Sequence, residues 1–158
     1  MDPAPDEAVR VSTLELFFDL VFVFTITQLT TVLTNEDTWR GVLQVVLMLG
    51  VIWWMYGGYA WLTNAVAPDR AMRRLILLAG MASYLVLALS IPKSFAHDGA
   101  AFGIAYALIV AVHTVLFAST SDEAVMRAIA RLAPFNAVTA GLVLAGGIAG
   151  GTALVSHA

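Results

Sequence analysis

Residues 11–30 are Val11-Ser-Thr-Leu-Glu-Leu-Phe-Phe-Asp-Leu-Val-Phe-Val-Phe-Thr-Ile-Thr-Gln-Leu-Thr30, a hydrophobic segment with two carboxylates near its start. The apolar run continues to Leu33. A helix over residues 14–33 would extend about 30 Å at about 1.5 Å per residue, which matches the hydrocarbon thickness of a bilayer. The sequence therefore predicts a transmembrane helix over these residues.

Glu15 has a structural explanation at the start of this helix. Ser12-Thr-Leu-Glu15 fits a capping box, in which the Glu15 amide donates to the Ser12 hydroxyl and the Ser12 amide donates to the Glu15 carboxylate. Val11 and Leu16 occupy the two positions of a hydrophobic staple. We expect Glu15 to be chiefly a helix cap at a membrane surface, where its carboxylate stays hydrated.

Asp19 has no such explanation, because it lies further along the helix, where the backbone amides are already paired. An acid at the centre of a membrane span costs about 2.5–3.5 kcal/mol on insertion scales. Asp19 must therefore be satisfied by another helix, by water or by a bound proton. Two interpretations stay open: a structural hydrogen bond between helices, and a role in handling ions or protons.

Composition places the chain among integral membrane proteins. Of its 158 residues, 60% are hydrophobic and only 12% are charged, against about 25% charged in ordinary soluble domains. The mean hydropathy is +0.86. A net charge of −3 without a basic surface predicts no nucleic-acid partner and leaves the lipid bilayer as the surrounding partner.

Several classes of chemistry are excluded or unsupported. The chain has no Cys, which excludes disulfides, thiolate catalysis and Cys-based metal sites. No catalytic motif or phosphate-binding loop occurs, and the sequence identifies no cofactor. The histidines are too scattered to predict a metal site: His97, His113 and His157.

Five apolar runs alternate with short polar loops and predict an all-α, polytopic transmembrane helical bundle. We expect residues 1–12 to be a cytoplasmic N-terminal segment and residues 13–158 to form the transmembrane domain. A soluble helical core is the competing interpretation, but soluble helices need a polar face, which these runs lack. The expected spans are 14–33, 41–62, 75–91, 99–117 and 132–155.

The basic residues predict the orientation. The N-terminus and the second and fourth loops carry Arg10, Arg70, Arg73, Arg74, Arg127 and Arg131, whereas the opposite side carries Arg40 and Lys93. Because positive charge is retained on the cytoplasmic side, the N-terminus is expected in the cytoplasm and the protein in the cytoplasmic membrane.

With this topology, four polar residues of the spans fall in the cytoplasmic half. Asp19 lies early in the first span, Asn64 at the inner end of the second, His113 near the inner end of the fourth and Asn136 early in the fifth. We expect these residues and Glu15 to form a polar layer that could bind an ion or a substrate. Separate structural hydrogen bonds are the alternative, and for His113 a structural histidine and a proton-transfer group both stay open.

Aromatic residues gather in the second span. Trp53 and Trp54 fall near the membrane centre, where they would either pack helices together or line a cavity. The adjacent Gly57-Gly58 would let a neighbouring helix approach closely or permit a kink.

Small residues recur at every fourth position of the fifth span. Such a stripe predicts a close helix interface, within the chain or between chains. Its members are Ala133, Ala137, Gly141, Ala145, Ala149 and Ala153, with Ala137, Gly141, Ala145 and Ala149 as its centre.

The first motif also carries a family resemblance. Leu14-Glu-Leu-Phe-Phe-Asp-Leu-Val-Phe-Val-Phe24, followed by Ile26-Thr-Gln-Leu29, resembles the signature of the bacterial low-temperature-requirement A family. This resemblance implies a polytopic bacterial membrane protein, linked by name to growth in the cold, without a settled activity. Further matching positions are Trp53-Trp54, Tyr59, Asn64, Asp69, Arg74, Met81, Ala88, Ile91-Pro92, Phe95, Phe102 and Tyr106.

The chain departs from the family in two ways. Members are longer, with a second hydrophobic half that has its own acidic motif, so this chain resembles the N-terminal half. Its expected partner is a complementary C-terminal half or further copies of itself in a homo-oligomer. The resemblance also leads us to expect an Arg one turn after Tyr106, where this chain has Val110. If that Arg pairs with Asp19 in the family, His113 is left as the nearest candidate partner here.

The leading functional hypothesis is a transporter or channel-like protein for protons or small cations that uses the intramembrane Asp19. The alternative is a structural or regulatory membrane subunit without transport or catalytic activity. A membrane enzyme comes third, and it would have to use Asp19 or His113 with a lipid or quinone substrate.

Overall fold

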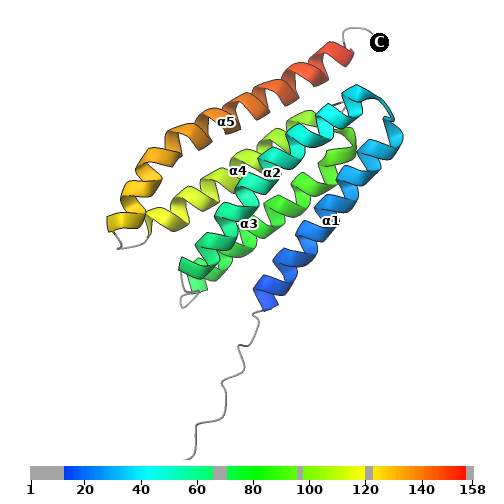
Figure 1. Cartoon of the computed structure of the whole chain (residues 1–158). Coiled ribbons are helices and arrows are strands. Elements are labelled where there is room, and N and C mark those ends of the chain that lie inside the picture. The colour runs from blue at the N-terminus through cyan, green and yellow to red at the C-terminus, as the bar shows by residue number, and fades with distance from the viewer. Residues whose placement is uncertain (1–12, 66–70, 96–97, 120–122, 156–158) are drawn as a thin grey trace, which may run out of the picture.

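The computed structural model describes residues 13–65, 71–95, 98–119 and 123–155. Within these ranges the chain is all-α, as predicted (Figure 1). Its elements are α1 (Thr13–Asn35), α2 (Trp39–Ala65), α3 (Ala71–Ser90), the 3-10 turn η1 (Ile91–Lys93), α4 (Gly99–Ala118) and α5 (Glu123–Val155).

All five α-helices are long and apolar enough to cross a membrane, which confirms the predicted number of spans. The main difference from the sequence prediction is that α5 begins at Glu123 rather than at residue 132. Hydropathy marks the apolar part of a helix, whereas Arg and Glu are good helix formers and extend the helix beyond it. The candidate spans are Leu16–Asn35, Trp39–Leu62, Ala71–Lys93, Gly99–Ala118 and Val125–Gly150.

Successive helices run antiparallel (Figure 1). The helix α3 lies between α1 and α4, while α2 packs against both α1 and α4. The last helix, α5, packs along α4 at one side of the bundle, and its span is the least buried of the five (Figure 1). One face of α5 is therefore well packed, and the rest of its surface is open to the membrane.

An aromatic cluster joins the first three helices. The Phe18 ring of α1 stacks on Tyr56 and Tyr59 of α2, with centroid distances of 4.9 and 4.7 Å, and it meets the edge of Tyr84 of α3 at 5.5 Å. Tyr59 is fully buried, and its hydroxyl donates a 2.6 Å hydrogen bond to the Leu77 carbonyl. The motif of the first helix thus supplies a core residue immediately before Asp19.

Glycines bring α4 and α5 together. A Cβ atom on Gly103 of α4 would lie 2.6 Å from the Leu144 Cα of α5, so no larger residue fits at this crossing. Gly99 and Gly147 meet backbone to backbone closer to the start of α4. Without a hydrophobic driving force between helices in lipid, such close backbone contact is a main source of packing energy.

Five threonine side chains of α1 are satisfied within the helix. Hydroxyls donate to carbonyls of the preceding turn at distances of 2.7 to 3.1 Å, and the donors are Thr25, Thr27, Thr30, Thr31 and Thr34. A threonine-rich helix can therefore lie in the bilayer without a hydrophilic face.

Candidate functional site

Asp19 lies on the exposed side of α1, near the start of the span that begins at Leu16. Its carboxylate accepts a 3.1 Å hydrogen bond from the Tyr56 hydroxyl of α2. The Tyr56 ring is held by stacking on Phe22 at 3.9 Å and on Phe18 at 4.9 Å. The partner that the structure records for this carboxylate is therefore a neutral phenol.

His113 lies where α4 crosses α2. A Cβ atom on Gly58 would be 2.9 Å from the His113 Cε1 atom, so this glycine makes room for the imidazole. The ring also makes an edge contact with Phe117 at 4.6 Å. The Nδ1 atom is buried and has no hydrogen-bond partner among the described residues.

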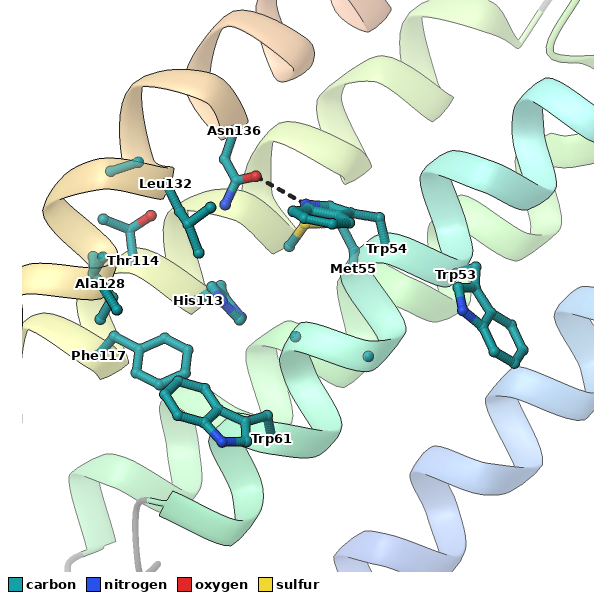
Figure 2. A pocket seen from close by; sticks show the side chains of 14 residues that line it. Trp53, Trp54, Met55, Trp61, His113, Thr114, Phe117, Ala128, Leu132 and Asn136 are labelled. Atoms are coloured by element: carbon teal, nitrogen blue, oxygen red, sulfur yellow. Dashed lines mark hydrogen bonds between the residues drawn. The ribbon is translucent and has the colours of Figure 1, made fainter. Parts of the chain in front are cut away.

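Asn136 joins α5 to α2. The Trp54 Nε1–H group donates a 3.1 Å hydrogen bond to the Asn136 Oδ1 atom (Figure 2). The sequence suggested that Asn136 lies early in the fifth span. Because α5 begins at Glu123, Asn136 instead lies near the middle of the span Val125–Gly150. It is buried, with 7% of its surface exposed.

A cavity of about 360 Å³ opens between α2, α4 and α5, and both His113 and Asn136 line it (Figure 2). Most of its wall is aromatic or aliphatic. The lining residues are Trp53, Trp54, Met55, Gly57, Gly58, Trp61, His113, Thr114, Phe117, Ala128, Ile129, Leu132, Ala133 and Asn136.

The structure does not gather the predicted site residues into one layer. His113 and Asn136 share the cavity, whereas Asp19 lies on α1, which packs against α2 and α3 but not along α4. His113 is therefore not the partner of Asp19, and Tyr56 takes that place. Val110 is buried in the core. Glu15 and Asn64 were also predicted to belong to this layer, but they are outside the part of the chain whose side chains the structure describes.

The two central tryptophans have different roles. Trp54 lies at the cavity and meets the edge of Phe135 at 6.1 Å, so the cavity-lining alternative holds for it. Trp53 also contributes to the cavity wall, but its ring extends toward α1, where it meets Phe22 at 6.2 Å (Figure 2). Of the adjacent glycines, Gly58 provides the close approach that the sequence suggested.

The small-residue stripe of α5 is not the face that packs on α4. The contact with α4 involves Gly147 and Leu144, and Ala140 is buried on the same side. A repeat of four residues rotates by about 40° at each step around a helix of 3.6 residues per turn, so the stripe turns away from the packed face. The central stripe residues are all exposed: Ala137, Gly141, Ala145 and Ala149.

Tyr56 and Gly58 were not predicted as site residues. Comparing helix depths could have found Tyr56, because α1 and α2 are antiparallel and both Asp19 and Tyr56 lie near the same end of the pair. The sequence shows no comparable signal for the contact of Gly58 with His113, which depends on how α4 is rotated.

Five membrane-length helices, packed by aromatic rings and glycines and with few polar side chains, define an integral membrane protein of the helical-bundle class. The family model described as bacterial low temperature requirement A protein (LtrA) matches residues 10–156, and the chain belongs to that family.

A protein of Rhizobium meliloti (strain 1021), itself described as uncharacterized, is 31% identical over 100 residues. That match covers 63% of this chain and 24% of the relative. The chain therefore spans well under two thirds of the length of that relative. No solved structure matches the chain.

Proposed function

We propose that the protein is a transporter or channel-like protein for protons or small cations, with Asp19 as the ion-handling carboxylate. The observation that carries this proposal is a carboxylate within a membrane span whose hydrogen-bond partner is the neutral Tyr56 hydroxyl. A phenol orients the carboxylate but does not neutralise its charge. The charge is then balanced by a proton or a bound cation, and the exchange of either one is the elementary step of transport.

The proposed orientation supports this assignment. With the N-terminus in the cytoplasm of a bacterium and the protein in its inner membrane, Asp19 lies near the cytoplasmic surface. Arg73, Arg74, Arg127 and Arg131 lie on the same side. Because Asp19 lies near the start of the first span, an ion reaches it from the cytoplasmic surface rather than through the cavity beside His113.

Proton flux into proteoliposomes tests this proposal directly. The purified chain is reconstituted around a pH-sensitive dye, and Asp19→Asn is compared with Glu36→Gln, the same change of carboxylate to amide just beyond α1. We expect Asp19→Asn to lower the flux by about tenfold or more, because it removes the only acid within the described part of the first span. Glu36→Gln should leave the flux unchanged.

Two outcomes contradict the proposal: wild-type flux of protons, Na⁺ and K⁺ no faster than in empty liposomes, and equal flux in wild type and Asp19→Asn. Tyr56→Phe separates orientation from charge, since it keeps the carboxylate and removes its hydrogen bond. It should reduce the flux less than Asp19→Asn does.

A second candidate function is that of a structural or regulatory membrane subunit. The observation in its favour is the exposed stripe centred on Gly141, where a Cβ atom would meet no atom within 4 Å. A surface of small residues lets another helix approach closely, either from a second copy of the chain or from a complementary C-terminal half.

A further inference from the structure

The cavity between α2, α4 and α5 is lined by apolar rings together with few polar groups, the usual composition of a small-molecule site. Its volume of about 360 Å³ lies within the range of such sites, about 300–1,000 Å³. Trp54, Trp61 and Phe117 supply aromatic surface, and Met55 and Leu132 supply aliphatic surface (Figure 2). A flat, apolar molecule fits these walls better than a hydrated ion does.

The cavity is reached from the bilayer. Trp54 and Trp61 line it, yet 50% and 51% of their surfaces are exposed. Both lie within the candidate span Trp39–Leu62, where an exposed surface faces lipid or another helix. A ligand dissolved in the membrane could therefore enter between α2 and α5 without crossing water.

The polar groups of the cavity are donors that the protein leaves partly unused. The Trp54 indole N–H and the Thr114 hydroxyl are occupied, since they donate to Asn136 Oδ1 and to the Val110 carbonyl. The Asn136 amide still has its two N–H groups, and the His113 Nδ1 atom has no partner in the described part of the chain. His113 and Asn136 extend toward the same hollow from α4 and α5 (Figure 2).

We propose that this cavity binds an aromatic ring with a carbonyl oxygen, a membrane-soluble compound of the quinone class. The ring packs against Trp54, Trp61 and Phe117, and the carbonyl accepts a hydrogen bond from the Asn136 amide beside His113. A lipid acyl chain could fill the same volume, but it would offer no acceptor to the Asn136 amide. This site is independent of Asp19, so ion flux and ring binding can succeed or fail separately.

The probe is menadione, a naphthoquinone, and the control ligand is 2-methylnaphthalene, which has the same fused rings and methyl group without the oxygens. Each is titrated against the chain in lipid nanodiscs, and saturable quenching or shift of tryptophan emission reports binding. Because the chain has no Cys, menadione cannot react with a thiol. We expect menadione to bind about tenfold or more tightly than 2-methylnaphthalene, since only menadione can accept a hydrogen bond from the Asn136 amide.

Two glycine substitutions on α2 provide the matched comparison. In Gly58→Ala the new Cβ atom would lie 2.9 Å from His113 Cε1, and it forces the imidazole toward the cavity. In Gly50→Ala the new Cβ atom meets nothing within 4 Å, and Gly50 does not line the cavity. Menadione affinity should fall by about tenfold with Gly58→Ala and stay within about twofold with Gly50→Ala.

Ala128→Leu fills the cavity from α5 and gives an independent variant if Gly58→Ala does not fold. Its menadione affinity should also fall by about tenfold. Menadione binding that does not saturate overturns the proposal, as does equal affinity in all variants. Equal binding of 2-methylnaphthalene overturns carbonyl recognition and leaves an apolar site for lipid chains.

Discussion

Tyr59 and Tyr84 belong to the same aromatic cluster, but only one of their hydroxyls has a partner. The Tyr59 hydroxyl donates to the Leu77 carbonyl at 2.6 Å, whereas the Tyr84 hydroxyl is buried and has no partner among the described residues. The rings meet each other at 5.8 Å, and both residues are buried. Their hydroxyls should therefore contribute to stability with different signs.

The corresponding prediction compares Tyr59→Phe with Tyr84→Phe. Tyr59→Phe should lower the free energy of unfolding by about 0.6–1 kcal/mol, because it removes an interhelical hydrogen bond. Tyr84→Phe should leave this free energy unchanged or raise it slightly, since it removes an unsatisfied buried group. Titration with SDS in mixed micelles, followed by far-UV circular dichroism, measures both values. Equal losses in the two variants would contradict this account.

Asp19 shows what the sequence could establish about a single residue. Its need for a partner followed from its position inside an apolar helix, where no backbone amide is free. The identity of the partner did not follow, because a tyrosine hydroxyl carries no charge and nothing in the sequence distinguishes Tyr56 from the other aromatic residues of α2. Matching helix depths narrows the choice, but the rotation of α2 decides which of its residues faces Asp19.

The contact between α4 and α5 depends on a few glycines, and one of them can be tested against a matched neighbour. A Cβ atom on Gly103 would lie 2.6 Å from the Leu144 Cα, whereas one on Gly146 would meet nothing within 4 Å. Gly103→Ala should lower the free energy of unfolding by about 1–3 kcal/mol, since the two backbones must separate.

Gly146→Ala serves as the control at an exposed position of α5. This substitution should leave the free energy of unfolding unchanged or raise it by up to about 1 kcal/mol, because alanine has a higher helix propensity than glycine. The same SDS titration applies to both variants. A Gly103→Ala protein as stable as Gly146→Ala would show that the two helices do not approach as closely as described.

The helix α5 also shows the limits of pattern recognition for an apolar element. The stripe centred on Gly141 was visible in the sequence as a four-residue repeat, but the structure packs a different face. In a helix that is apolar on every side, composition does not mark the buried face, because lipid and protein interior are equally apolar. Steric fit determines which face of such a helix is buried, and for α5 this fit depends on the glycines of α4.

Assembly is a property of the whole molecule, and the exposed stripe of α5 predicts that copies of the chain associate. If copies of the chain associate through this surface, Gly141→Leu should convert an oligomer into a monomer, because a large side chain prevents close helix approach. Gly50→Leu is the matched control, since Gly50 is also exposed and a Cβ atom there meets nothing within 4 Å. It should leave the oligomer intact.

Sedimentation in detergent, with far-UV circular dichroism to confirm folding, distinguishes these outcomes. A monomeric wild-type chain would exclude self-assembly through the stripe, as would an oligomer that Gly141→Leu leaves unchanged. Monomeric Gly50→Leu would show that any enlarged surface residue disrupts assembly, and the stripe would then have no special role.

For the molecule as a whole, the sequence determined the fold class, the number of spans and the antiparallel order. These depend on the length and hydropathy of segments, which are local properties of the chain. The neighbours of each helix are not local, and so the separation of Asp19 from His113 was not predicted. The depth of Asn136 was misjudged because Arg127 and Arg131 were assigned to a loop, whereas they lie within α5.

The position of α5 has a consequence for how the protein is made. Of the five helices, α5 emerges last from the ribosome, and the helices that it contacts are α4, along its length, and α2, through Trp54. The first four helices can therefore complete their mutual contacts while α5 is still being synthesised. The insertion machinery then adds α5 to a finished surface, and no earlier helix must wait for it.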